Sequence, residues 1–266
     1  MALNNRLSVL VVAGTDSSGG AGIARDVETL SAFRVHASLA VTAVTAQTDQ
    51  SVEAVEIMPA RLVAKQMYAA ISGAHLQAVK LGMLATGEIA ETVGVVLAKH
   101  PDLAVVIDPV LVSSSGRNLM RGDAAAVYGR LFPFATLITP NLPELAMLSG
   151  EPIATSEGDM ILQAKALMAR RARAVLVKGG HADGPEATDL LVTSQAIIRM
   201  SAPRLGASMR GTGCALSSAI AANLALGLGL QPSVERAKAY VFERLSKVSD
   251  RLPSVDPGRD MGHLRI

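Results

Sequence analysis

Short apolar runs alternate with longer segments of helical period along most of this chain, and this alternation constrains its fold more than any other feature. The runs with the composition of buried strands are residues 8–14, 39–46, 77–83, 103–110, 135–140 and 173–180. The segments with apolar residues at helical spacing are residues 22–33, 59–71, 86–100, 157–172, 212–228 and 234–249. Because consecutive parallel strands are joined by crossover helices, this order predicts an α/β fold with a mostly parallel central sheet and helices on both faces.

The region after residue 180 departs from this alternation. Two short runs, LLV at 190–192 and AIIRM at 196–200, follow a turn-rich stretch at 181–189 and predict a β-hairpin. We see no internal repeat, low-complexity tract or linker in the sequence. We therefore expect residues 1–266 to form one domain, which is a size that single α/β domains often reach.

Composition argues against several classes of protein. The chain has 266 residues, a net charge of +2, 3% aromatic residues and no Trp, so it has little with which to stack nucleic-acid bases. Its densest basic stretch, ARRARA at 169–174, ends a predicted helix, where cations interact favourably with the helix dipole; a nucleic-acid patch is the alternative. A single cysteine excludes an internal disulfide and a cysteine-built metal site. Since no apolar run reaches the ~18 residues of a membrane span, we expect a cytoplasmic protein.

Polar or glycine-rich residues follow each predicted strand. In open α/β sheets, ligands bind outside the carboxyl ends of the strands. Gly, Pro, Asn and Asp are also ordinary turn residues, which is the alternative interpretation. Turns do not require the residue types found at Gln47, Asp108, Glu144 and Lys178. These residues therefore favour a binding site at this edge of the sheet.

Two glycine-rich motifs near the start of the chain fail as nucleotide fingerprints. GTDSSGG at 14–20 has the glycine spacing of a Walker A loop, but Gly20 occupies the position of its lysine. GGAGIAR at 19–25 is similar to a dinucleotide-binding fingerprint, but Arg25 replaces the small residue that lets helix and strand pack closely.

The stretch GTGC at 211–214 opens a predicted helix. Its two glycines let backbone N–H groups turn toward one point, and the positive end of the helix dipole reinforces them, which predicts an anion site. Cys214 would lie in the first turn, where the pKa of a thiol, ordinarily ~8.5, tends to be lowered. The alternative is that Cys214 is a small buried apolar residue.

Together these motifs resemble those of the 4-amino-5-hydroxymethyl-2-methylpyrimidine kinases and phosphomethylpyrimidine kinases of thiamine biosynthesis, within the ribokinase-like superfamily. The resemblance covers nearly the whole chain, from about residue 8 to 250, with its motifs in family order. They are AGTDSSGGAGI (13–23), AVTAQ (43–47), KLGML (80–84), DPV (108–110), TPNLPE (139–144), LVKGGH (176–181) and GTGC (211–214). The resemblance implies a ribokinase-like three-layer fold.

The resemblance also implies the reaction: two successive ATP-dependent phosphorylations of the pyrimidine, first on its hydroxymethyl oxygen and then on the phosphate so formed. The residues expected to line the pyrimidine pocket are Gly14, Asp26, Gln47 and Met83. The amide of Gln47 suits this role because it can donate to and accept from an aminopyrimidine edge at once.

A transfer site is implied in the same way. Lys178 and Thr212 would bind the nucleotide, and Asp108 and Glu144 would hold Mg²⁺ chiefly through water, as that ion prefers. Cys214 would be the base that removes the hydroxyl proton, at a position where many ribokinase-like sugar kinases carry an Asp.

The backbone N–H groups of Gly211, Thr212, Gly213 and Cys214 would stabilise the charge that develops on the transferring phosphoryl group. Relatives are commonly homodimers, and we expect the same of this chain.

The chain departs from the usual family pattern at four positions: Ser17, Arg25, Arg210 and Ala215. Arg210 stands where a His commonly precedes GTGC, and it would either add a phosphate contact or point into solvent.

Three other functions compete with the pyrimidine kinase. A pyridoxal or pyridoxine kinase of the same superfamily is the nearest. A nicotinamide-dependent oxidoreductase is disfavoured by the incomplete glycine fingerprint. A catalytically silent binding protein is disfavoured because Lys178, Asp108, Glu144 and Cys214 are all present.

Overall fold

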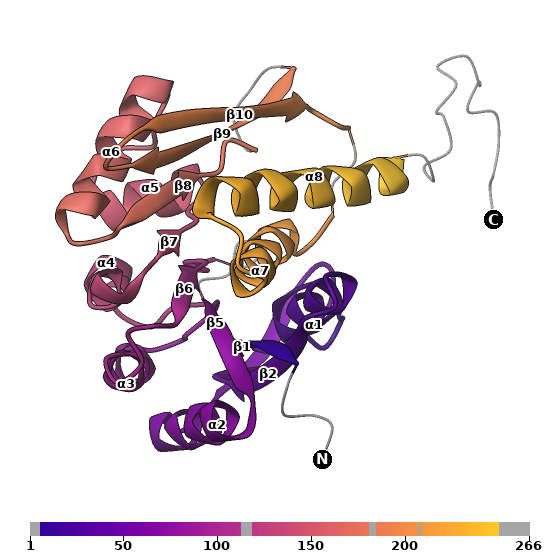
Figure 1. The fold of residues 1–266 in the computed structure, drawn as a ribbon, viewed down its shortest axis with the longest axis vertical. Helices are drawn as coiled ribbons and strands as arrows, with labels where there is room; N and C mark the ends of the chain where they lie inside the picture. The colour runs from indigo at the N-terminus through magenta and orange to yellow at the C-terminus, as the bar shows by residue number, and fades with distance from the viewer. Residues whose placement is uncertain (1–5, 113–118, 181–184, 207–208, 250–266) are drawn as a thin grey trace, which may run out of the picture.

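A computed structural model describes residues 6–112, 119–180, 185–206 and 209–249, and an eight-stranded sheet runs through its centre (Figure 1). The strand order is β10-β9-β8-β7-β6-β5-β1-β2. The parallel strands are β1 (Leu7–Ala13), β2 (His36–Val41), β5 (His75–Leu81), β6 (Ala104–Ile107), β7 (Leu137–Ile138) and β8 (Ala174–Val177). β9 (Glu186–Thr193) and β10 (Ile197–Pro203) form the antiparallel hairpin expected from the sequence.

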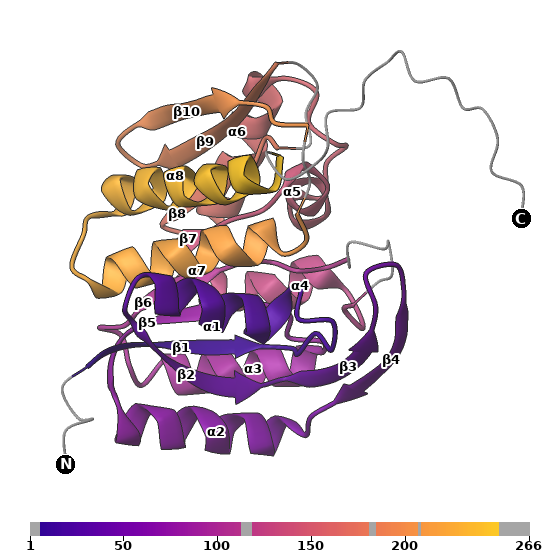
Figure 2. The same ribbon diagram turned by 90° about the vertical axis from the view of Figure 1, so that its right-hand side faces the viewer.

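Helices cover both faces of this sheet, as predicted (Figures 1 and 2). One face carries α1 (Gly22–Ala32), α7 (Thr212–Ala225) and α8 (Leu230–Ser249). The other carries α2 (Ala60–Gly73), α3 (Gly87–Leu97), α4 (Ala124–Gly129), α5 (Leu142–Ser149) and α6 (Glu157–Ala169). Strand side chains alternate between the two layers: in β1, Val9 and Val11 pack under α1 and α7, whereas Leu10 and Val12 face the opposite layer.

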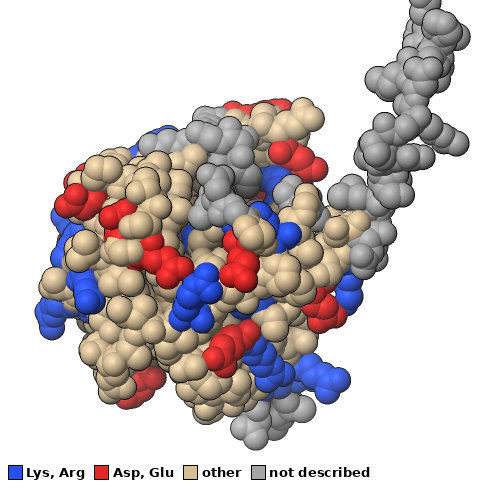
Figure 3. Space-filling view, turned by 90° about the horizontal axis from the view of Figure 1, so that it is seen from above, with Lys and Arg blue, Asp and Glu red and all other residues tan. Residues whose placement is uncertain are grey.

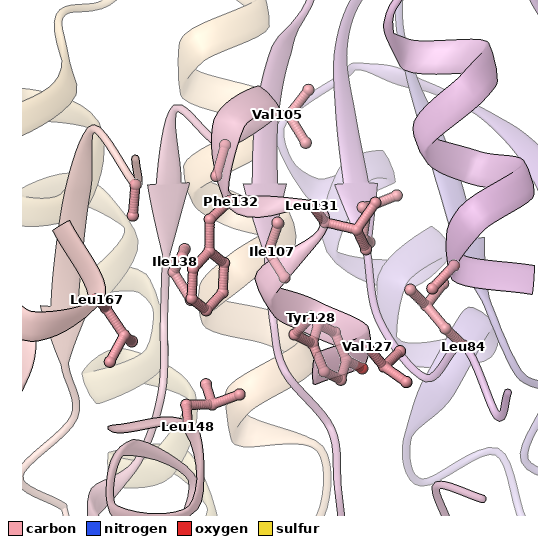
Figure 4. Close-up of a cluster of buried hydrophobic side chains, with 14 of the residues drawn as sticks. Leu84, Val105, Ile107, Val127, Tyr128, Leu131, Phe132, Ile138, Leu148 and Leu167 are labelled. Atoms are coloured by element: carbon pink, nitrogen blue, oxygen red, sulfur yellow. The ribbon is translucent and has the colours of Figure 1, made fainter. Parts of the chain in front are cut away.

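The larger apolar cluster contains two aromatic side chains, Tyr128 of α4 and Phe132 of the short 3₁₀ helix η1 (Phe132–Phe134) (Figure 4). Both are fully buried. The Tyr128 hydroxyl donates to the carbonyl oxygen of Gly82 at 3.2 Å, which satisfies a buried polar group and ties α4 to the chain just beyond β5.

The predicted strand at 39–46 divides into two. β2 ends at Val41, and β3 (Ala43–Gln47) leaves the central sheet to pair with β4 (Val52–Ile57) in a separate antiparallel hairpin. Thr42 lies between the two strands and is held by two hydrogen bonds. Its N–H donates to the carbonyl of Ala13 at 2.9 Å, and its hydroxyl donates to the carbonyl of Met83 at 2.6 Å. The hairpin consequently extends past the carboxyl ends of β1 and β2 (Figure 2).

Surface charge is mixed. On the face shown in Figure 3, acidic and basic side chains alternate without an extended basic patch. Among the described residues, no helix is long and apolar enough to cross a membrane.

Candidate active site

Lys178, directly after β8, lies between two carboxylates. Its Nζ lies 3.0 Å from Oδ1 of Asp108, which follows β6, and 3.6 Å from Oε2 of Glu144 in α5. Asp108 is nearly fully buried, and Ser217 of α7 donates to its second oxygen at 3.3 Å. The site therefore gathers the ends of two sheet strands and two helices around one ammonium group.

Electrostatics favour the charged forms of Lys178 and Asp108 but not that of Glu144. Burial alone would lower the pKa of Lys178, but Asp108 and Glu144 outweigh it and raise that pKa. Burial alone would raise the pKa of Asp108, whereas Lys178 and, to a smaller extent, Lys80 bring it below its ordinary value. The pKa of Glu144 is raised, because its burial outweighs the opposing effect of Lys178.

Glu144 is fixed by the start of α5. Asn141 is the N-cap of this helix, and its side chain accepts from the Glu144 N–H at 2.8 Å while Oε2 of Glu144 accepts from the Asn141 N–H at 2.8 Å. This reciprocal capping box explains the Asn-x-x-Glu spacing that the sequence shows. Asn141 and Lys178 also form an isolated parallel β-bridge. The backbone pairing that positions the helix cap therefore also positions the lysine.

The N terminus of α7 packs against this cluster. A Cβ on Gly213 would stand 3.2 Å from Nζ of Lys178 and 3.6 Å from Oδ2 of Asp108. Gly211, the N-cap, has φ +71°, and a Cβ there would stand 2.5 Å from the carbonyl oxygen of Gly20. Both glycines are thus required by close approach. Amides in the first turn of a helix have no intrahelical acceptor, so those of Thr212, Gly213 and Cys214 can serve an anion.

The thiol of Cys214 is half-buried, and its environment contradicts the expected activation. Burial raises its pKa to about 11; Lys80 opposes this, whereas Asp26 and Asp108 add to it. The expectation of a lowered pKa at the helix start was wrong, because burial of the thiol raises its pKa and the carboxylates of Asp26 and Asp108 add to that effect. In the chain without ligands, Cys214 is therefore a thiol at neutral pH.

A buried ion pair lies close behind the thiol. Lys80 of β5 and Asp26 of α1 are both 0% exposed, with Nζ 2.9 and 3.0 Å from the two carboxylate oxygens. Ser218 of α7 also donates to Asp26, at 2.8 Å. Sequence reasoning did not assign Lys80 or Ser218 a role, although a lysine inside an apolar strand signals a buried counter-ion. The pyrimidine contact expected of Asp26 stays a prediction.

The other expected pyrimidine residues lie near the β3–β4 hairpin. A Cβ on Gly14 would stand 3.0 Å from Sδ of Met83, so these two residues are in close contact. The backbone of Gln47 is held by Ser17, whose hydroxyl accepts from the Gln47 N–H at 2.8 Å and donates to the Gln47 carbonyl at 2.7 Å. Burial alone would raise the pKa of Asp16, but Ser18 and the nearby Gln47 side chain hold it below its ordinary value.

Arg210 does not simply point into solvent, and the alternative, a phosphate contact, stays a prediction. Its guanidinium forms ion pairs with Asp16 and Asp49.

Asp189 of β9 was also missed by sequence reasoning. Its Oδ1 accepts from the N–H of Gly179 at 2.9 Å, and its Oδ2 lies 2.6 Å from Nζ of Lys238 in α8. Asp189 therefore fixes the turn that directly follows Lys178. His181, the last residue of the LVKGGH motif, lies outside the described residues.

Within the described parts of the chain, no group of three or more His, Cys, Asp or Glu side chains is placed to hold a metal ion. Asp108 and Glu144 supply two carboxylates, a donor set that suits a hydrated Mg²⁺ completed by substrate phosphates.

A family model described as phosphomethylpyrimidine kinase matches residues 16–258. A hydroxymethylpyrimidine/phosphomethylpyrimidine kinase of Rhizobium meliloti is 44% identical over 256 residues, covering 96% of this chain and 95% of the relative. The enzyme of that name from Escherichia coli is 38% identical over 244 residues, covering 91% and 92%.

Solved structures give a consistent result. A phosphomethylpyrimidine kinase of Clostridium difficile matches with a TM-score of 0.78 at 36% identity, covering 89% of this chain and 98% of its own. A Bacillus subtilis pyridoxal kinase solved as an ADP complex matches with a TM-score of 0.82 at 30% identity, covering 89% and 90%.

Proposed function

This chain belongs to the phosphomethylpyrimidine kinase family, and from that premise we propose how its residues divide the work of the reaction. With ATP, it phosphorylates 4-amino-5-hydroxymethyl-2-methylpyrimidine and then the resulting monophosphate, in thiamine biosynthesis. The structural observation that carries the assignment of roles is the contact of Lys178 and Asp108 with the glycine-lined start of α7.

The γ-phosphoryl group of ATP would pass between Lys178 and the amides of residues 211–214. Phosphoryl transfer depends mainly on positioning and on stabilising charge at the phosphoryl oxygens. The ammonium of Lys178 and the N–H groups of Thr212, Gly213 and Cys214 would supply that charge; their closeness in the structure supports this role.

Asp108 and Glu144 would hold Mg²⁺ through water, with the nucleotide phosphates completing its coordination. The ion would neutralise phosphate charge. In the structure the same carboxylates bind Lys178, so nucleotide binding would shift that ammonium toward the phosphates and leave the carboxylates to the hydrated ion.

Gln47 would recognise the edge of the pyrimidine ring. Because an ionised carboxylate only accepts hydrogen bonds, the nearby Asp16 would favour an orientation of the Gln47 amide that turns its N–H toward the carboxylate. The amide oxygen then remains to accept from the 4-amino group. Gly14 and Met83 would pack against the ring, and Asp26 would act on the site through Lys80 or through the substrate.

Cys214 would remove the hydroxyl proton during the first transfer. With its pKa at about 11, only about one chain in ten thousand carries a thiolate at pH 7. In a loose, dissociative transition state the alcohol proton leaves late, so a weakly populated base is sufficient.

The direct test is to incubate the purified chain with ATP, Mg²⁺ and the hydroxymethylpyrimidine, and to follow products by mass spectrometry. Sequential appearance of the mono- and diphosphate is expected. Absence of both would overturn the function. Pyridoxal, run in parallel, tests the second candidate, which the match to pyridoxal kinase at a TM-score of 0.82 favours.

Three further expectations complete the proposal. Residues 1–266 would form one kinase domain, the chain would be a homodimer, and it would act in the cytoplasm. Light scattering on the purified chain tests the homodimer.

A further inference from the structure

One side chain, Arg210, connects three segments that are far apart in the sequence. Its Nη2 donates to Oδ2 of Asp16 at 3.2 Å. Its Nη1 lies 2.8 Å from the hydroxyl of Ser18, 3.1 Å from the carbonyl oxygen of Thr48 and 2.7 Å from Oδ1 of Asp49. Arg210 itself directly precedes Gly211, so it ties the start of α7 to the β1–α1 loop (residues 14–21) and to the β3–β4 turn (residues 48–51).

The two ion pairs of Arg210 differ in burial. The side chain of Asp16 is 1% exposed and that of Asp49 is 79% exposed, whereas Arg210 is 20% exposed. An exposed ion pair contributes little to stability and is screened by salt, but breaking a buried one leaves an uncompensated charge. The Asp16 contact is therefore a fixed anchor, and the Asp49 contact is one that solvent can replace.

Two neighbouring contacts reinforce the anchored side. Arg25 donates from Nε and Nη2 to the carbonyl oxygen of Gly20, at 3.3 and 3.2 Å. Ser17 holds the backbone of Gln47. The β1–α1 loop is thus held by side chains from α1 and from the chain before α7, and it in turn holds the end of β3.

We propose that Arg210 is a positioning residue that keeps the β3–β4 turn closed against the pyrimidine site, with Asp16 as its permanent partner and Asp49 as its reversible one. Gln47 adjoins Thr48, so release of the turn displaces the amide that faces the pyrimidine. This inference rests on the proposed function, because it assigns Gln47 to substrate binding. Release of the turn through Asp49 alone leaves ATP binding unaffected, since Asp49 contacts neither Lys178 nor Asp108 among the described interactions.

The experiment compares Asp49→Asn and Arg210→Met with Glu91→Gln. Glu91 pairs with Arg130 at 3.4 Å with both side chains more than half exposed, which makes it a matched surface control. Hydrogen exchange of the peptide covering residues 44–56 is measured without any substrate. Steady-state kinetics are then measured with the uncharged hydroxymethylpyrimidine at saturating ATP. Arg210→Lys tests rescue, since a single ammonium cannot reproduce the fork that spans both aspartates.

Asp49→Asn is expected to accelerate exchange in 44–56 and to raise the KM for the pyrimidine by up to about fivefold, with the KM for ATP unchanged. Arg210→Met is expected to raise the pyrimidine KM by at least about tenfold, and Arg210→Lys by an intermediate factor. Raising the salt concentration should increase the pyrimidine KM of the unmodified chain but not that of Asp49→Asn.

Exchange in 44–56 that is unchanged in both Asp49→Asn and Arg210→Met would overturn the proposal. Equal salt dependence in the unmodified chain and Asp49→Asn would overturn it as well. If Arg210→Met fails to fold, Asp49→Asn still decides. If the unmodified chain does not phosphorylate the pyrimidine, the proposed function fails, while hydrogen exchange still shows whether Arg210 holds the turn.

Discussion

Gly213 and Lys178 are so close that a single methyl group on the glycine would stand 3.2 Å from the ammonium nitrogen of the lysine. In the structure Asp108 and Glu144 hold the ammonium at this position. The spacing therefore depends on the absence of a side chain at position 213, at the point where a phosphoryl group would pass.

We predict that Gly213→Ala lowers turnover at least about tenfold by displacing Lys178, because small misplacements of positioning groups are costly in catalysis. Stability should change by less than about 1 kcal/mol, since alanine favours a helix. Gly73→Ala is the control, because a Cβ there meets no atom within 4 Å. Unchanged turnover in Gly213→Ala would remove Lys178 from the transfer site. Steady-state kinetics and urea unfolding measure the two effects.

Cys214 is predicted to react as an unactivated, half-buried thiol in the free chain. Its alkylation by iodoacetamide should rise with pH toward a midpoint at about 11, rather than at the ~8.5 of a free thiol. As the only cysteine in the chain, it gives an unambiguous signal, and Cys214→Ala supplies the blank. A midpoint below 8 would restore the activated thiol.

The same pKa fixes the sign of two pH effects. The folded chain holds the thiol proton more tightly than the unfolded chain, so this contribution to the free energy of unfolding is constant below pH ~8.5 and is lost as pH rises toward about 11. If the thiolate is the base, turnover rises with pH over that range, and Cys214→Ala lowers turnover about 10²-fold or more with little change in substrate affinity. A flat pH profile with near-normal turnover in Cys214→Ala would reduce Cys214 to a packing role.

Gln47→Ala is predicted to raise the KM for the pyrimidine about tenfold while leaving the KM for ATP unchanged. The reason is that we propose the amide, which lies near Asp16, to face the ring rather than the nucleotide. Gln50→Ala, in the exposed β3–β4 turn, is the neighbouring control. Loss of ATP binding in Gln47→Ala would mean that the two ligand sites have been exchanged. Separate titrations of each substrate make the distinction.

Much of the fold was predictable from sequence because its signals are local. Apolar runs and helical periods located every parallel strand of the sheet, and Thr86 marks the start of α3 through its side chain, which accepts from the Ile89 N–H. The division of residues 39–46 was not predictable, because it depends on bonds from Thr42 to Ala13 and Met83. From the sequence alone, residues 39–46 are predicted to form a single strand.

Part of the candidate site was likewise predictable from the sequence, and part was not. Strand-end position identified Lys178, Asp108 and Glu144, because parallel topology brings such ends together. The partners that tune them come from distant parts of the chain: Lys80 and Asp26 are 54 residues apart, and Arg210 and Asp16 are 194 apart. The pKa of Cys214 was misjudged for this reason, since its sign depends on burial that no local motif encodes.

Asp189 and Lys238 are predicted to support ATP binding without touching ATP. Lys238→Met removes the ammonium that lies 2.6 Å from Asp189, and so loosens the carboxylate that holds the N–H of Gly179 beside Lys178. We expect the KM for ATP to rise about fivefold and that for the pyrimidine to stay constant. Lys247→Met is a matched control on the same helix, since its pair with Glu243 is exposed. Equal KM values for ATP in the two variants would contradict this role.

We predict that removing one member of the buried pair Lys80–Asp26 strongly lowers the free energy of unfolding. Replacing both members with apolar residues should lower it much less. Both side chains are 0% exposed, so Lys80→Met or Asp26→Asn alone leaves an unpaired group in the interior and should lower the free energy of unfolding by about 3–5 kcal/mol. The double variant Lys80→Met/Asp26→Leu should recover a large part of that loss, although Ser218 then loses an acceptor. Urea unfolding of the unmodified chain, Lys80→Met, Asp26→Leu and the double variant gives the coupling energy. Kinetics on the folded Asp26→Asn variant then separate its roles: a raised KM for the pyrimidine would support substrate contact, whereas an altered pH profile with an unchanged KM would indicate that Asp26 acts on Cys214 through Lys80. Single variants as stable as the unmodified chain would show that the pair is not buried in solution.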